Sequence, residues 1–438
     1  MLTSIVYSFR IQPIQELNER NQLKQLVKPI IIFSIILCHN AFATNGYFQH
    51  GYGIKSQGMG GVGIALPQDA LAAATNPAGM GFIGNRYDLG VNIFNPQREA
   101  EISGNANPSN NRVNDGNDSE LFLIPEFGYN KVLSDKYTIG LSVYANGGMN
   151  TNYKDGISLF GSPSAGVDLK QIFLTPSVTF KPEPNHSFGV AINFAYQSFQ
   201  AKGLDNFANS TYSNSPSNVY DKGHDHSYGA GIKLGWIGKV TDRLTLGATY
   251  HSKTYMSKFD KYAGLFAAGG DFDIPASYGV GFAYQGTPDL TLAFDYQKIE
   301  YGDIKSVNNP LVPNLSSSKL GKADGAGFGW RDIDVFKVGF NYQWNDKLVL
   351  RAGYNHNSQP IPSSETFFNI LAPGVIKDHL SLGFTYKIKE DHELTLAYTH
   401  AFKEDVKGSG SIPAGFGGGE ADLEMYQNSL GIAYGINF

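Results

Sequence analysis

The sequence is poor in cysteine, in charged residues and in long apolar runs. Cys38 is its one cysteine, and charged residues make up 17% of its 438 positions, against about 25% in an average soluble protein. No apolar stretch approaches the roughly 20 residues that a helix needs to cross a bilayer, so a helical membrane protein is excluded. The formal net charge is −5, which lacks the basic excess typical of nucleic-acid-binding proteins.

Glycine and aromatic residues are, in contrast, abundant. The chain has 51 Gly, 29 Phe and 25 Tyr. That many aromatic residues with so little net charge exclude a disordered chain. Because long apolar runs are missing as well, the composition indicates β-structure.

Residues 1–43 have the three parts of an export signal. Basic residues precede an apolar core at 30–37, and residues 41–43 read Ala-Phe-Ala, a small-x-small cleavage site. We therefore predict a signal peptide over 1–43 and a mature chain that begins at Thr44. Cys38 lies in the signal, so the mature chain has no disulfide, no thiolate metal ligand and no cysteine nucleophile.

Alternation of apolar with small or polar residues predicts transmembrane strands that turn their apolar side chains to lipid and the others to the lumen. In 188–196, for example, Phe, Val, Ile, Phe and Tyr alternate with Gly, Ala, Asn and Ala. Fourteen segments follow this pattern: 82–96, 120–131, 136–146, 167–180, 187–200, 227–239, 243–254, 274–285, 289–301, 333–345, 347–356, 378–388, 392–403 and 424–438.

The connections between these segments are alternately short and long, six short and seven long. Outer-membrane barrels have short periplasmic turns, long external loops and an even number of strands. The predicted fold class is therefore all-β, a fourteen-stranded antiparallel transmembrane barrel in a Gram-negative outer membrane. A soluble β-sandwich, the alternative, would not alternate its loop lengths. Aromatic residues before the short turns and at the C-terminus predict an interfacial girdle: Tyr129, Phe180, Trp236, Tyr284, Trp344, Tyr386 and Phe438.

Residues 44–81 precede the first strand and do not alternate. A fourteen-stranded barrel has a lumen wide enough to leak, so we predict that 44–81 fold inside it as a plug, with the barrel over 82–438. The Gly-x-Gly-x-x-Gly pattern at 58–63 is no dinucleotide site, because no strand precedes it and no acidic residue stands about 20 positions further on.

The order of several short motifs resembles a known family. The motifs are Asp69-Ala70-x-Ala72, Asn76-Pro77-Ala78, Gly329-Trp330-Arg331-Asp332, the run from Asn341 to Tyr354, Leu380-Ser381-Leu382-Gly383 and Leu394-x-Leu396-x-Tyr398-Thr399-His400. In this order, over essentially the whole mature chain, they resemble the FadL-type long-chain fatty-acid and hydrocarbon transporters of Gram-negative outer membranes.

The resemblance implies a monomeric barrel closed by an N-terminal hatch that carries Asn76, Pro77 and Ala78. In that family a hydrophobic ligand is captured among the external loops and reaches an apolar pocket. It then leaves sideways into the membrane through a gap at an inward kink of the third strand. Gly147 and Gly148, which follow the third predicted strand, match the kink by position. Glycines there break the side-chain ladder; the alternative is an ordinary loop start.

A fatty acid would need a cation for its carboxylate. The alternation places five basic residues in the lumen: Arg86, Lys170, Lys233, Lys337 and Arg351. Pairing with luminal acids such as Asp88 is expected to occupy most of them, and Lys337 and Arg351 are the candidates for binding the head group. The basic residues that hold the carboxylate in the well-known family member have no match in this chain, which leaves a neutral hydrocarbon open as the ligand.

Four aromatic residues of the external loops are predicted to form an exposed capture surface for the ligand: Phe266, Phe272, Phe367 and Phe368. Asp221, His224, Asp225 and His226 have the composition of a metal site, but in a polar external loop we expect them to be solvated. The sequence contains no catalytic or cofactor-binding motif, so we predict that the protein is not an enzyme and uses no cofactor or metal.

The predicted function is passive outer-membrane transport of hydrophobic compounds. Long-chain fatty acids are the first expectation, and aromatic or alkane hydrocarbons are the alternative by the same route. A general porin for polar solutes and an adhesin or structural barrel are the alternatives of another class. The expected partners are the hydrophobic ligand, outer-membrane lipid with lipopolysaccharide, and the barrel assembly machinery, for which a terminal Phe438 is a typical signal.

Overall fold

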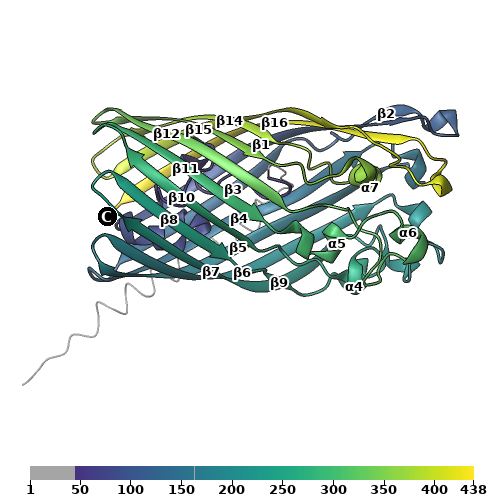
Figure 1. The fold of residues 1–438 in the computed structure, drawn as a ribbon, viewed down its shortest axis with the longest axis horizontal. Coiled ribbons are helices and arrows are strands. Elements are labelled where there is room, and N and C mark those ends of the chain that lie inside the picture. The colour runs from purple at the N-terminus through teal and green to yellow at the C-terminus, as the bar shows by residue number, and fades with distance from the viewer. Residues whose placement is uncertain (1–44, 162) are drawn as a thin grey trace, which may run out of the picture.

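The computed structural model describes residues 45–161 and 163–438. The predicted signal peptide and its cleavage site lie outside these residues. The described residues form one antiparallel sheet that closes on itself as a barrel (Figure 1). No helix among them is long and apolar enough to cross a membrane.

Within the described residues, fourteen strands make the wall of the barrel. They are β1 (Arg86–Ser103), β3 (Phe122–Val132), β4 (Tyr137–Tyr153), β5 (Ala165–Glu183), β6 (His186–Lys202), β7 (Asp225–Lys239), β8 (Leu244–His251), β10 (Ser277–Gln285), β11 (Leu290–Ile299), β12 (Ile333–Asn345), β13 (Leu348–Asn357), β14 (Asp378–Lys387), β15 (His392–Val406) and β16 (Glu420–Asn437). Each wall strand pairs with its neighbours along the chain, and β1 pairs with β16 from Arg86 opposite Asn437 to Ser103 opposite Glu420. This last pairing closes the barrel.

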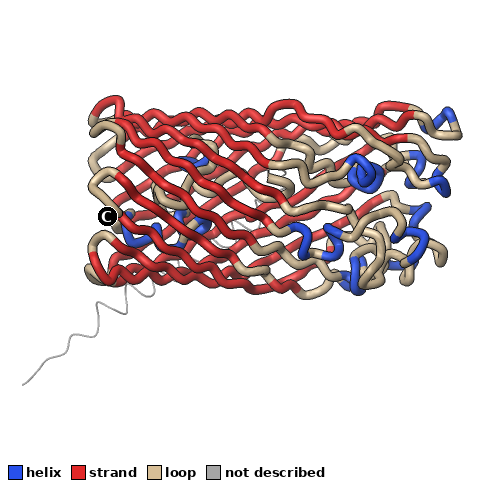
Figure 2. The backbone as a smooth tube through the Cα atoms, in the orientation of Figure 1, coloured by secondary structure: helices blue, strands red, loops and turns tan. Residues whose placement is uncertain are grey.

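Short turns gather at the end of the barrel that holds the C-terminus, and long loops gather at the other end (Figure 2). The loops contain two further strands, β2 (Arg112–Asp115) and β9 (Tyr255–Met256), which pair with β1 and β7. They also contain the short helices α4 (Ala267–Gly270), α5 (Lys305–Asn308), α6 (Asn314–Ser317) and α7 (Thr366–Asn369), and the 3-10 turns η2 (Pro108–Asn110), η3 (Ser158–Phe160), η4 (Asp205–Phe207), η5 (Pro216–Asn218), η6 (Asp260–Tyr262), η7 (Tyr301–Asp303), η8 (Ser363–Glu365) and η9 (Ala414–Phe416).

The predicted barrel of fourteen antiparallel strands is confirmed, while several strand limits differ from the prediction. The first strand begins at Arg86 rather than at 82, because a 3-10 turn, η1 (Pro77–Phe82), occupies that point. β1 runs on to Ser103 and β4 to Tyr153, beyond the predicted ends at 96 and 146. These extensions reach the external end, where a strand no longer faces lipid on one side and therefore loses the apolar alternation.

The outer surface of the wall is apolar, and the inner surface is polar or small. On β6 the side chains of Phe188, Val190, Ile192 and Phe194 are 44–52% exposed, whereas the intervening Ala191 and Asn193 are buried. Aromatic rings meet at the end that carries the short turns: Tyr87 stacks on Phe438 at 4.6 Å between ring centroids, and Tyr129 lies 6.2 Å from Phe438. This distribution is that of a barrel wall in lipid with an interfacial girdle.

Candidate functional site

Residues 45–81, called the hatch below, lie inside the barrel. The hatch contains α2 (Ile54–Gln57), α3 (Ala72–Thr75) and most of η1, and almost all of its side chains are buried. It bonds to wall strands all around the lumen: β1, β3, β4, β5, β6, β7, β8, β11, β12, β13 and β15. These strands are spread around the closed ring of the wall, so the hatch reaches across the lumen from one side to the other.

Asn76 is the best-connected residue of the hatch. Its side-chain amide donates to the carbonyl oxygens of Ile64 at 2.8 Å, of Trp236 at 3.1 Å and of Ala248 at 3.3 Å. Its side-chain oxygen accepts from the backbone N–H of Ala78 at 3.0 Å and caps η1. The side chain is fully buried, so loss of the amide donors would leave buried carbonyls unpaired.

Pro77 and Ala78 lie against the wall because small residues face them. The carbonyl oxygens of Pro77 and Ala78 accept from Thr179 of β5 at 2.9 Å and from Ser187 of β6 at 2.7 Å. A Cβ atom on Gly189 of β6 would come within 2.2 Å of the Ala78 nitrogen. The sequence motif is therefore one of the places where the hatch lies closely against the wall.

Two wall carboxylates hold the glycine-rich part of the hatch by its backbone. Glu126 accepts from the N–H groups of Gly53 at 3.2 Å and Ile54 at 3.0 Å. Asp295 accepts from those of Gly63 at 2.7 Å and Ile64 at 3.0 Å. The sequence analysis missed both acids. The sequence pattern could have identified them, since each acid stands at a lumen-facing position of its strand.

An ion-pair network ties α2 to the wall near the short-turn end. Arg86 bonds to Asp88 at 2.7 Å and also to Glu393 at 2.5 Å, and Lys55 of α2 bonds to the same Glu393. Asp69 of the hatch lies beside this network. Burial raises the pKa of the Asp69 carboxyl to about 6, and the neighbouring Asp88 carboxylate raises it as well, against the lowering effect of Lys55 and Arg86.

Lys337 and Arg351, the two basic residues predicted to bind a ligand head group, are both buried and both contact the hatch. Lys337 Nζ lies 3.3 Å from the carbonyl oxygen of Gly61 and 3.3 Å from Oε1 of Gln297. Arg351 donates to Gln68 of the hatch at 2.8 Å and to Thr385 at 2.7 Å. In this arrangement their hydrogen bonds hold the hatch.

The wall has a gap between β3 and β4. β3 pairs with β4 only from Phe127 opposite Val143 to Val132 opposite Thr138, although β3 continues to pair with β1 as far as Phe122. Within the described residues, 122–126 therefore have no strand partner on the β4 side. The apolar side chains of Phe94, Phe122, Ile124 and Ala145 pack together here and are called the gap cluster.

Gly147 and Gly148 lie in β4 at this gap, and not at the start of a loop as in the alternative reading. The pairing of β4 with β5 is irregular between Ala145 and Gly147, which marks a β-bulge. A Cβ atom on Gly147 would lie 1.8 Å from the carbonyl oxygen of Tyr47, so only glycine allows this approach. Gly148 donates its N–H to the same oxygen at 3.0 Å.

The hatch supplies the hydrogen bonds that β3 does not give to β4. Gln49 donates its backbone N–H to Asn146 at 3.2 Å and its side-chain amide to the carbonyl oxygen of Ala145 at 2.9 Å. The backbone of β4 is thus satisfied by 47–49 of the hatch where it turns away from β3. Pro125, which cannot donate a backbone hydrogen bond, stands in the unpaired stretch of β3 and fits an edge.

An aromatic cluster encloses the first residues of the hatch. Tyr47 lies 4.9 Å from Tyr301, 5.8 Å from Trp330 and 6.2 Å from Phe272 between ring centroids. Its backbone N–H donates to the Tyr301 hydroxyl at 3.1 Å. Phe272 in turn lies 4.8 Å from Phe266, so two of the predicted loop phenylalanines belong to this cluster.

The prediction that Phe266, Phe272, Phe367 and Phe368 form an exposed surface is wrong. All four are at most 2% exposed. Phe367 and Phe368 pack against Phe160 and Phe328, at 5.3 and 5.0 Å between centroids. The external loops fold back over the lumen and bury these rings, as apolar side chains require in water.

The acidic and histidine residues at 221–226 do not converge. His224 lies 3.0 Å from Asp168 of β5, and Asp225 accepts from the backbone N–H of Lys261 at 2.8 Å. Among the described residues no group of three or more metal-binding side chains is close enough to hold an ion.

Comparison with known proteins gives the same fold. The toluene transporter TodX of P. putida matches with a TM-score of 0.67 at 19% identity, over 89% of this chain and 99% of that one. A FadL homologue of Pseudomonas aeruginosa matches with a TM-score of 0.68 at 19% identity, over 89% of this chain and 98% of the other.

Sequence relatives include outer membrane protein P1 of Haemophilus influenzae, 22% identical over 64% of this chain and 65% of that protein. The chain spans about half to two thirds of the length of the first curated relatives that it matches. A family model described as "Outer membrane protein transport protein (OMPP1/FadL/TodX)" matches residues 37–438. The chain therefore belongs to the OMPP1/FadL/TodX family and is a β-barrel protein of the outer membrane.

Proposed function

We propose that this protein carries uncharged hydrophobic compounds across the outer membrane and releases them sideways into the bilayer through the gap between β3 and β4. The observation that carries the proposal is the interrupted pairing of β3, whose inner side is lined by the gap cluster. A gap closed by apolar side chains, rather than by strand pairing, offers an apolar compound a path that breaks no hydrogen bonds between strands.

The aromatic cluster around Tyr47 is the proposed binding pocket on the way to the gap. Tyr47 and Phe48 of the hatch occupy it, so a ligand that enters from the loops takes the place of their rings. The next residue, Gln49, bonds to β4 at the gap. Movement of 47–49 therefore frees the pocket and the gap together, and we propose that 45–81 act as a hatch in this sense.

Passive release into the membrane is the favourable route for such a ligand. An apolar solute gains nothing by entering periplasmic water, because burial of apolar surface is worth about 25 cal/mol per Å². A sideways exit transfers the ligand from one apolar environment to another, so no energy source is needed.

The placement of the buried cations supports an uncharged ligand. Lys337 and Arg351 hold the hatch through Gly61 and Gln68, so a ligand carboxylate would compete with the hatch for them. Two solved structures with similar folds are toluene transporters, one of P. putida and one of Ralstonia pickettii. We therefore place aromatic and alkane hydrocarbons ahead of fatty acids as ligands.

Long-chain fatty acids are the second candidate, and Lys233 is the observation that favours them. Its ammonium group is buried and bonds to the carbonyl oxygen of Ala74 and to the Tyr144 hydroxyl, at 2.5 and 2.6 Å. No carboxylate of the described residues forms an ion pair with it. A buried cation without a counter-ion is costly, and a ligand carboxylate would supply one.

A general porin is disfavoured by the way the hatch fills the lumen. Two cavities between hatch and wall have volumes of about 20 Å³ each, which is space for about one water molecule. An adhesin or structural barrel would leave the uptake of hydrophobic compounds unchanged.

The test is uptake of labelled toluene, hexadecane and oleate by a strain that lacks its own transporters of this family. The strain carries this protein, its Lys233→Met variant, or no insert. We expect toluene and hexadecane to enter faster with the protein, and the Lys233→Met variant to match it. Oleate uptake that depends on Lys233 would move the assignment to fatty acids. If no compound enters faster than in the empty strain, the transport proposal fails.

A further inference from the structure

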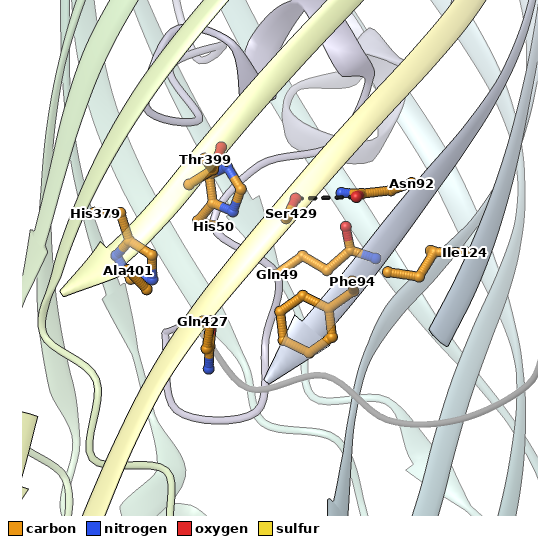
Figure 3. A pocket seen from close by; sticks show the side chains of 10 residues that line it. All are labelled: Gln49, His50, Asn92, Phe94, Ile124, His379, Thr399, Ala401, Gln427 and Ser429. Atoms are coloured by element: carbon orange, nitrogen blue, oxygen red, sulfur yellow. Dashed lines mark hydrogen bonds between the residues drawn. The ribbon is translucent and has the colours of Figure 1, made fainter. Parts of the chain in front are cut away.

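A small cavity with polar and apolar lining residues lies between the hatch and the wall, beside the gap cluster (Figure 3). Gln49 and His50 of the hatch form one side, and His379 of β14 and Thr399 of β15 form another. Phe94 and Ile124, two members of the gap cluster, also line it. The cavity therefore joins a polar surface to the apolar surface at the proposed exit.

His379 is the unusual member of this cavity. It is fully buried. One ring nitrogen donates to the backbone carbonyl of Asn355, and the other has no hydrogen-bond partner among the described residues. Any imidazole has at least one N–H to donate, and in its neutral form one nitrogen that accepts. A buried polar group without a partner costs free energy, so the position points to a partner that the chain itself does not provide.

His50 stacks on His379, with ring centroids 5.6 Å apart and an angle of 18° between the ring planes. Nε2 of His50 lies 3.3 Å from the Thr399 hydroxyl. Burial, together with the charge of Lys337, lowers the pKa of His50 to about 4, so this ring is neutral at neutral pH. No carboxylate or ammonium group of the described residues lines the cavity. The missing partner of His379 is therefore an uncharged polar group.

The size of the cavity limits the partner to a single group. A volume of about 20 Å³ holds one water-sized group and has no room for the body of a ligand. The body can lie against the gap cluster instead, because Phe94 and Ile124 belong both to the cluster and to the cavity wall. The amide of Gln49 links the two places, since it bonds to Ala145 at the gap.

We propose that this cavity binds one hydroxyl group of a hydrophobic compound, which donates to the free ring nitrogen of His379, while the apolar part of the same compound lies at the gap. The protein then prefers apolar compounds that carry a single uncharged polar group, such as alcohols, over the parent hydrocarbon. The proposal rests on the proposed transport function and names the ligand class within it.

Two probes of equal chain length, 1-dodecanol and dodecane, test the proposal because they differ by one hydroxyl group. Equilibrium dialysis of the purified full-length protein in detergent measures binding, and uptake of the labelled probes by cells measures transport. We expect 1-dodecanol to bind about fivefold more tightly than dodecane, the effect of one net hydrogen bond. His379→Phe should remove this preference and leave dodecane binding within about twofold.

A matched substitution controls for loss of a histidine elsewhere. His400→Phe changes the neighbouring strand β15 at a residue that bonds to Asn428 instead of lining the cavity, and the preference should persist. His379→Leu serves as a second variant if His379→Phe does not fold. Equal binding of both probes to the unaltered protein, or a preference that survives both His379 variants, overturns the proposal and leaves the cavity as the site of a structural water. Preferential binding without uptake would uphold it while the transport function fails.

Discussion

Asn76→Asp is expected to turn the closed barrel into one that conducts ions. The substitution keeps the size of the side chain but replaces its amide by a carboxylate, which would face the carbonyl oxygens of Ile64, Trp236 and Ala248. Three hydrogen bonds then become repulsive contacts between buried groups. The change destabilises the attachment of the hatch to the wall by a free energy on the order of 3 to 5 kcal/mol. We expect the hatch to leave its seat against β7 and β8 while the strands of the barrel stay paired.

Planar-bilayer recording measures the ion conductance of the barrel directly. The unaltered protein should show no steady conductance, and the Asn76→Asp variant should show open steps. Asn85→Asp is the control, because Asn85 uses its side-chain oxygen as an acceptor from Val132 at 2.7 Å and a carboxylate keeps that bond. The idea is refuted if Asn76→Asp stays closed, or if Asn85→Asp opens to the same extent. Retained heat-resistant migration of the folded barrel in gels shows that the strands are intact.

Ala145→Phe is expected to lower the uptake of toluene and hexadecane at least tenfold. Ala145 is the one small member of the gap cluster, opposite Phe122 and Ile124 of β3. A phenyl ring at this position fills the gap from inside, and overpacking a close-fitted site costs about 1 to 3 kcal/mol. The barrel tolerates that cost because β4 is paired with β5 on both sides of the bulge between Ala145 and Gly147.

Ile139→Phe provides the matched control for the gap. Ile139 lies on the same strand, where β4 is still paired with β3, and its side chain is exposed on the outer surface. Uptake by this variant should equal that of the unaltered protein. Normal uptake by Ala145→Phe would mean that the ligand leaves by another way, and it would remove the observation on which the proposed function depends.

The strands of the barrel could be read from the sequence because their determinants are local. A transmembrane strand such as β6 needs apolar residues at every second position to face lipid, and small or polar residues between them to face the lumen. Residues 188–196 show this pattern without reference to any other segment. The turns add their own short signals. The ends of the strands were predicted less accurately, since β1 and β4 continue into water, where the alternation is no longer required.

The candidate site was less accessible to sequence analysis. Asn76, Pro77 and Ala78 and the glycines of β4 were found by resemblance, but the residues that they contact between hatch and wall lie more than 90 residues away in the chain. Phe367 and Phe368 were expected to be exposed, because a loop is on the outside by default. Whether a loop folds back over a lumen depends on what lies beneath it, which no local pattern states.

By itself, the sequence determined the number of strands, their direction, the lipid-facing surface and the presence of a segment long enough to fill the lumen. Those features follow from the two-residue period of a strand and from the surroundings on each side of it. Only the tertiary structure decided that the cations Lys337 and Arg351 bond to the hatch, that β3 and β4 part beside the gap cluster, and that His379 is buried with one ring nitrogen unpaired among the described residues. Contacts across a closed ring join residues that are remote in sequence, so their pairing is fixed by packing and hydrogen bonding in three dimensions.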